Sequence, residues 1–127
     1  MDFKKALEEV EKTLYDLQEE NKTIPIVVEG EKDVEALQLL GVRGVILPIN
    51  QGRSLTDFCD WLAERFEKII ILTDWDRHGG ILCRMMIKQL RGRIEYNTSF
   101  RKIFAKYTMI RTVEGLPGWL KTMRNRI

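Results

Sequence analysis

The fold of this chain is decided by the stretch Ile69-Ile70-Ile71-Leu72-Thr73-Asp74-Trp75-Asp76-Arg77, in which an apolar run ends abruptly in two aspartates. Such a short apolar run predicts a buried strand. Asp74 and Asp76 are two residues apart, so along an extended chain they project to the same side. Two carboxylates held this close repel each other unless a cation lies between them. Oxygen ligands of this kind suit Mg²⁺, which takes one or two carboxylates and leaves its other positions to water and phosphate.

A second apolar run ends in the same way. Residues 24–28 read Ile-Pro-Ile-Val-Val and are followed by Glu29 and Gly30. In an open parallel sheet, ligands collect at the carboxyl ends of the strands. We therefore expect Glu29 to share one crevice with Asp74 and Asp76, as a candidate magnesium site for phosphate chemistry.

Size and composition predict an ordinary globular protein. The 127 residues predict a single domain over residues 1–127, and contents of 44% hydrophobic and 31% charged residues are typical of that class. No apolar run approaches the roughly 18 residues of a membrane span. The first residues lack the apolar core of a signal peptide, so a cytoplasmic location is expected. Cys59 and Cys83 form no CxxC pair and are expected to be small buried residues.

Charge is divided unevenly along the chain. Residues 1–76 carry 9 lysines or arginines against 17 aspartates or glutamates, whereas residues 77–127 carry 12 against 2. Such a split between halves points to a polyanionic partner. Solvated faces of C-terminal helices are the other explanation. We favour nucleic acid, bound through the basic C-terminal half.

Strand-like and helix-like segments alternate along the sequence. Apolar runs predict strands over residues 24–29, 42–49, 68–74, 93–98 and 109–113. Apolar residues at spacings of three and four predict helices over residues 2–20, 31–40, 55–66, 79–91, 100–107 and 116–126. This alternation predicts an α/β fold with a mostly parallel sheet of four to five strands, flanked by helices and preceded by an N-terminal helix.

The order of the motifs resembles the Toprim domain. That domain is shared by type IA and type II topoisomerases, bacterial primases, the 5S ribosomal RNA maturase and small stand-alone proteins. Residues 27–33, Val-Val-Glu-Gly-Glu-Lys-Asp, are similar to its glutamate motif, and residues 73–77, Thr-Asp-Trp-Asp-Arg, to its aspartate motif. Two motifs in the right order, each after an apolar strand, are far more specific than either alone. The resemblance spans roughly residues 24–113 and implies a Rossmann-like fold.

The resemblance also implies roles for four residues. Glu29 matches the family glutamate, a general acid/base or metal ligand, which makes it a candidate catalytic residue. Asp74 and Asp76 match the Mg²⁺-binding aspartates, and Arg77 matches a basic residue placed to meet a phosphate.

One departure from the family pattern follows the aspartates. Many relatives carry a further acidic residue there, where this chain has His78, Gly79 and Gly80. Without that acid, the site would hold one metal ion, or it would hold a second metal ion through the substrate. His78 is the only histidine in the sequence. It is either a surface residue or a residue that takes part in proton transfer.

Several residues around the motifs are candidates for binding phosphate. Glycines allow a backbone to approach a phosphate closely, and arginines carry the complementary charge. The candidates are Gly30, Asn50, Gly52, Arg53, Arg77, Gly79 and Arg84. For Asn50, the alternative is that it only shapes a turn. For Arg84, Lys88 and Arg91, the alternative is that they form a solvated face of a helix. Trp75 points away from its neighbouring aspartates, which favours packing over base stacking.

The function expected from these features is Mg²⁺-dependent phosphodiester chemistry on nucleic acid, with Mn²⁺ as a substitute ion. Nuclease-like hydrolysis, including RNA processing, is the leading hypothesis. A non-catalytic, Mg²⁺-dependent nucleic-acid-binding or scaffold module is the alternative. A larger nucleoprotein complex or a homo-oligomer is compatible with either. Haloacid-dehalogenase-type phosphatases and response-regulator receivers fit worse, because both place their acidic motif after the first strand.

Overall fold

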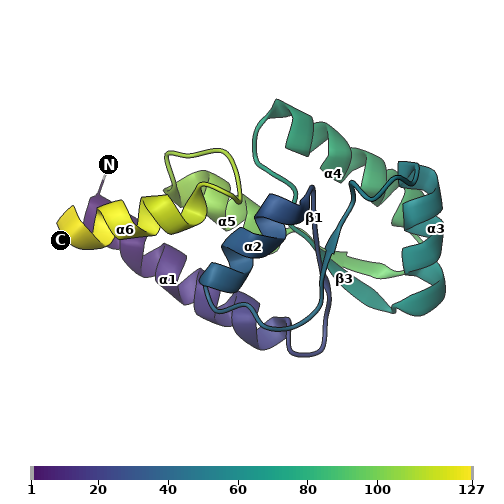
Figure 1. Ribbon diagram of the computed structural model, residues 1–127, viewed down its shortest axis with the longest axis horizontal. Helices are drawn as coiled ribbons and strands as arrows, with labels where there is room; N and C mark the ends of the chain where they lie inside the picture. The colour runs from purple at the N-terminus through teal and green to yellow at the C-terminus, as the bar shows by residue number, and fades with distance from the viewer. Residues whose placement is uncertain (1, 127) are drawn as a thin grey trace.

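A four-stranded parallel sheet forms the centre of the protein in the computed structural model, which describes residues 2–126 (Figure 1). The strand order is β2-β1-β3-β4, and every neighbouring pair is parallel. The strands are β1 (Ile26–Val28), β2 (Ile46–Pro48), β3 (Lys68–Ile71) and β4 (Glu95–Asn97). The predicted α/β class and parallel sheet are therefore confirmed.

Six helices within the described residues pack against this sheet. They are α1 (Phe3–Glu20), α2 (Glu31–Leu39), α3 (Leu55–Arg65), α4 (Arg77–Leu90), α5 (Ser99–Tyr107) and α6 (Leu116–Arg126). Buried residues of α1, α2, α5 and α6 cluster on one face of the sheet, and those of α3 and α4 on the other. Figure 1 shows this division, with α3 and α4 to the right and α1, α5 and α6 to the left.

The apolar run that follows Lys68 supplies both of these cores. Ile69 and Ile71 contact the α3–α4 side, whereas Ile70 and Leu72 contact the side of α1, α2, α5 and α6. All four are fully buried. A strand covered on both faces needs apolar residues at every position, which explains why this run does not alternate with polar residues.

The predicted helices are present, but α4 begins earlier than expected. It starts at Arg77, two residues before the glycine pair that was expected to open it. Asp76 takes an extended conformation as the N-cap, and its side chain accepts a hydrogen bond from the Gly79 N–H. Aspartate is a preferred N-cap, because its oxygen satisfies an amide that has no partner within the helix.

The predicted strand over residues 109–113 is wrong. This segment is irregular and joins α5 to α6. Its backbone bonds to the end of the β3 segment rather than to a sheet: the Arg111 carbonyl accepts from Trp75 N–H, and Val113 N–H donates to the Asp74 carboxylate. Since these groups are already engaged, they form no strand ladder.

The strands are also shorter than predicted. The segment from Val42 to Val45, expected to be part of β2, instead connects α2 to the sheet. Val42 N–H donates to the Leu37 carbonyl at the end of α2, and Gly44 N–H donates to the Asn21 side chain. These bonds fix the approach to β2.

Other predictions about burial are confirmed. Cys59 and Cys83 are buried free thiols, and α6 buries Trp119, Leu120 and Met123. In the described part of the chain, we find no helix with the length and apolar character needed to cross a membrane.

Candidate functional site

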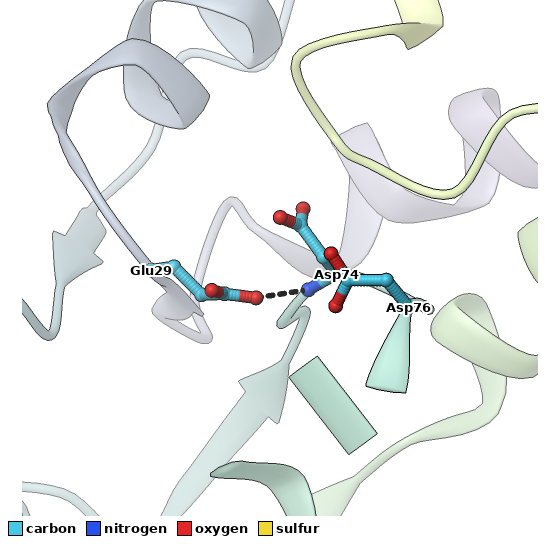
Figure 2. Close-up of side chains that lie close together, drawn as sticks. All are labelled: Glu29, Asp74 and Asp76. Carbon is cyan, nitrogen blue, oxygen red and sulfur yellow. Dashed lines mark hydrogen bonds between the residues drawn. The ribbon is translucent and has the colours of Figure 1, made fainter. Parts of the chain in front are cut away.

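Three carboxylates meet at the carboxyl end of the central strands. Glu29 follows β1, and Asp74 and Asp76 follow β3, which pairs directly with β1. One oxygen from each side chain lies within 4.8 Å of the other two. Figure 2 shows the group, with Glu29 facing the backbone of Asp74. The structure thus brings together the three acids that the sequence places at strand ends.

Each carboxylate is held by one backbone amide. Glu29 Oε2 accepts from Asp74 N–H at 2.7 Å, and Asp74 Oδ1 accepts from Val113 N–H at 2.8 Å. Asp76 Oδ1 accepts from Gly79 N–H at 2.7 Å. The second oxygen of each group has no hydrogen bond in the part of the chain that the structure describes. The side chains are therefore oriented, and one oxygen of each remains available to a ligand.

The electrostatics of this group favour a cation. The pKa of Asp74 is raised to about 7, chiefly by burial and also by the negative charges of Glu29, Asp33 and Asp76, while the hydrogen bond from Val113 N–H opposes the rise. A divalent ion would stabilise the ionised form of Asp74 by compensating for this repulsion. The donors are all carboxylate oxygens, the ligand type that Mg²⁺ prefers. The residues present therefore fit a magnesium ion.

An open cleft of about 550 Å³ lies beside the carboxylates. Three of the candidate phosphate-binding residues, Gly30, Asn50 and Arg53, line it together with Glu29 and Asp74. The Arg53 guanidinium also stacks 4.8 Å from the centre of the Trp61 ring. The cleft thus combines acidic groups with an arginine from the loop that precedes α3.

The remaining candidates lie along that loop and on α4. Gly52 takes a φ of +80°, a left-handed conformation that glycine adopts without strain. Arg77 is exposed at the first position of α4, and Arg84 is exposed two turns further on.

The structure gives Gly79 a packing role. A Cβ atom at this position would lie 1.8 Å from the Asp74 carbonyl oxygen, so only glycine fits. Its N–H is engaged by Asp76, and its carbonyl accepts from the Thr73 hydroxyl at 2.8 Å. Gly80 N–H donates to the Asp76 carbonyl. These amides complete the helix cap rather than pointing freely to a phosphate.

Neighbouring residues support the loop that carries the aspartates. The Trp75 indole N–H donates to the Ile110 carbonyl at 2.7 Å, and its ring packs 5.7 Å from that of Phe104. The prediction that Trp75 packs is therefore confirmed. His78 is exposed, with Nε2 at 3.8 Å from Glu29 Oε1.

Sequence reasoning missed two charged residues near the site. Arg101 of α5 donates from Nε and Nη2 to the Asp74 carbonyl, at 3.1 and 2.9 Å, and from Nε to the Thr73 carbonyl. Glu114 lines the cleft from the irregular segment before α6. Glu114 is one of only two acidic residues in residues 77–127, and this rarity could have marked it as a candidate site residue. Nothing local indicates the contact of Arg101, because it joins residues 27 positions apart.

Residues 24–107 match the Toprim domain family. The chain is 38% identical to a UPF0292 protein of Thermoplasma volcanium over 77% of this chain and 83% of that protein. It is 36% identical to a UPF0292 protein of Methanocaldococcus jannaschii over 90% of this chain and 88% of the relative. Among solved structures, a putative protein from Aquifex aeolicus superposes with a TM-score of 0.72 at 26% identity, covering 82% of this chain and 94% of that one.

These similarities agree with the geometry of the site. Toprim domains bind Mg²⁺ through acidic residues and take part in nucleic-acid chemistry, and this chain holds a cluster of three carboxylates at the corresponding motifs. The family match covers most of the sequence, and the parallel sheet and the order of the motifs are consistent with it. The chain therefore belongs to the Toprim domain family.

Proposed function

We propose that this protein hydrolyses phosphodiester bonds of nucleic acid in a Mg²⁺-dependent reaction. The observation that carries the proposal is the group formed by Glu29, Asp74 and Asp76. Each of these side chains is fixed by one backbone amide and keeps one oxygen available, and Glu29 and Asp74 line an open cleft. A fixed set of oxygen ligands next to space for a substrate is what phosphoryl chemistry requires.

Asp74 and Asp76 would hold the ion, with Glu29 beside it. When bound, Mg²⁺ would stabilise negative charge on the phosphate and on the attacking and leaving oxygens. Glu29 would act as the base, since its Oε1 is the carboxylate oxygen not bonded to the Asp74 amide. From this position it would accept the proton of an attacking water. Two arginines, Arg53 at the cleft and Arg77 at the start of α4, would bind substrate phosphates.

The charge of the chain supports a polyanionic substrate. Residues 77–127 carry 12 basic residues against 2 acidic ones, and α4, β4, α5 and α6 lie within this half of the chain. Helix α4 begins directly at the acidic group, because its N-cap is Asp76. A nucleic acid attracted to the basic helices would therefore pass near the carboxylates.

The test is cleavage of labelled single- and double-stranded RNA and DNA in Mg²⁺, in Mn²⁺ and in EDTA. The wild type is compared with the double variant Asp74→Asn/Asp76→Asn and with Asp16→Asn, which changes an exposed acid of α1. We expect metal-dependent cleavage by the wild type and by Asp16→Asn, and none by the double variant. Equal cleavage by all three proteins, or cleavage in EDTA, would contradict the proposal.

A non-catalytic, Mg²⁺-dependent nucleic-acid-binding module is the second candidate. Two observations favour it. Glu29 Oε2 is already bonded to a backbone amide, and this chain has His78, Gly79 and Gly80 where the resemblance to the Toprim domain implies a further acid. This candidate predicts salt-sensitive binding of nucleic acid by the wild type without turnover of any substrate in the cleavage assay.

A further inference from the structure

Two arginine side chains converge on the first turn of α4. A Cβ atom placed on Gly80 would lie 3.4 Å from Arg101 Nη2 and 3.5 Å from Arg84 Nη1. One guanidinium comes from α4 and the other from α5. Among the described residues, neither group forms an ion pair with a carboxylate. Like charges this close repel each other, so the arrangement favours an anion between them.

The two guanidiniums differ in how firmly they are held. Arg101 is fixed by its bonds to the Asp74 and Thr73 carbonyls. Arg84 is exposed, and its guanidinium makes no hydrogen bond within the part of the chain that the structure describes. One group is thus oriented in advance and the other keeps its donors available. This combination suits the bidentate binding of a phosphate by arginine.

A third cation lies in the same neighbourhood. Burial raises the pKa of the Cys83 thiol, and the charges of Arg101, Arg84 and Lys102 act together against that rise. The charge of Lys102 therefore acts on Cys83 from the same surroundings as the two arginines. Gly80 itself adds no side chain to the space between the guanidiniums.

This arginine pair lies next to the acidic site but on the other side of α4. His78 and Leu82 line the cleft, whereas Gly80 and Arg84 are displaced from them by two positions, about 200° around the helix. Gly80 N–H donates to the Asp76 carbonyl, so Gly80, beside which both guanidiniums lie, is one turn, about 5.4 Å, beyond Asp76. A strand crossing the N-terminus of α4 would meet the carboxylates first and the arginines next.

We propose that Arg84 and Arg101 bind the phosphate adjacent to the one that reacts at Glu29, Asp74 and Asp76. The substrate class is then a polynucleotide with at least two consecutive phosphates, rather than a phosphomonoester. This inference rests on the proposed function and narrows its substrate. Arg101 binds the neighbouring phosphate and also positions Asp74 through its carbonyl, whereas Arg84 contributes only to binding.

The test measures binding in EDTA, so that it does not depend on turnover. A labelled single-stranded oligonucleotide of about ten nucleotides is titrated with protein by fluorescence anisotropy, from about 50 to 200 mM salt. The variant is Arg84→Gln, since changing Arg101 would also disturb Asp74. The matched control is Arg43→Gln, an exposed arginine in the connection between α2 and β2, at the opposite edge of the sheet.

We expect Arg84→Gln to weaken binding about ten-fold and to lower the slope of log K against log salt by about 0.7, with Arg43→Gln unchanged. Gly80→Asp, which places a carboxylate between the guanidiniums, should weaken binding similarly. If the wild type binds but both variants match Arg43→Gln, this inference fails and the proposed function stands. If the wild type binds no nucleic acid in EDTA and none in Mg²⁺, the proposed function itself fails.

A second measurement separates the phosphate positions. The affinity for a dinucleotide carrying two phosphates is compared with that for a nucleoside monophosphate. Arg84→Gln should weaken binding of the dinucleotide and leave that of the monophosphate unchanged. An equal loss for both ligands would overturn the assignment of Arg84 to the adjacent phosphate.

Discussion

Asp74 should destabilise the protein in the absence of metal. Its pKa in the folded state is about 7, whereas an aspartate in an unfolded chain titrates near 3.9. The folded protein therefore binds this proton more tightly than the unfolded chain does. The stabilisation that protonated Asp74 contributes to the free energy of unfolding is therefore fully present below about pH 4, and it is lost as the pH rises from about 4 to 7.

The size of the effect follows from the shift. About three pKa units at 1.36 kcal/mol each give an upper limit of about 4 kcal/mol. Asp74 is only partly buried, so solvent screening reduces the expected value to about 1–2 kcal/mol. In Asp74→Asn the amide oxygen can still accept the hydrogen bond from Val113 N–H. The substitution therefore removes the charge and keeps the contact.

We expect Asp74→Asn to be more stable than the wild type by about 1–2 kcal/mol at pH 8 in EDTA, with a midpoint of thermal unfolding about 3–6 °C higher. Near pH 4 the difference should vanish. Urea unfolding followed by circular dichroism at both pH values measures it, and Asp16→Asn is the control for removing an exposed carboxylate. A variant no more stable than the wild type at pH 8, or an equal gain at both pH values, would refute the reasoning.

Three further predictions concern the same region. Mg²⁺ at about one hundred times its Kd should stabilise the protein by about 2.7 kcal/mol in thermal unfolding, and its affinity should fall below about pH 7 because Asp74 then holds its proton; an affinity independent of pH would contradict this. Gly79→Ala should destabilise the fold by about 2 kcal/mol or more in urea unfolding, because its Cβ would meet the Asp74 carbonyl, whereas Gly118→Ala, with open space around it, should not. Trp75→Phe should cost about 1 kcal/mol through loss of the bond to the Ile110 carbonyl. It should also speed hydrogen exchange in residues 108–115, and unchanged exchange would argue against a role in holding that segment.

The main features of the site could be predicted from sequence because they are local. An apolar run long enough for a strand buried on both faces, ending in Asp74 and Asp76, sets both the strand and the side to which the acids project. Parallel pairing then requires the ends of β1 and β3 to be adjacent, which brings Glu29 to the same place.

The parts that could not be predicted depend on contacts between distant segments. The apolar spacing of residues 109–113 is strand-like, but the backbone there is bound to residues 74 and 75, nearly 40 positions away. Asp76 has two uses that its pattern does not distinguish, as a helix cap and as a candidate ligand. The contact of Arg101 with the Asp74 carbonyl likewise exists only after α5 packs on the face of the sheet that carries Ile70 and Leu72.

The most direct test of the account is a comparison of Glu29→Gln with the wild type, in which cleavage and binding of the same oligonucleotide are measured in Mg²⁺. Glutamine keeps an oxygen for the Asp74 amide but cannot accept the proton of an attacking water. We predict that cleavage is lost and that most of the binding affinity remains. Cleavage by Glu29→Gln at the wild-type rate would contradict it.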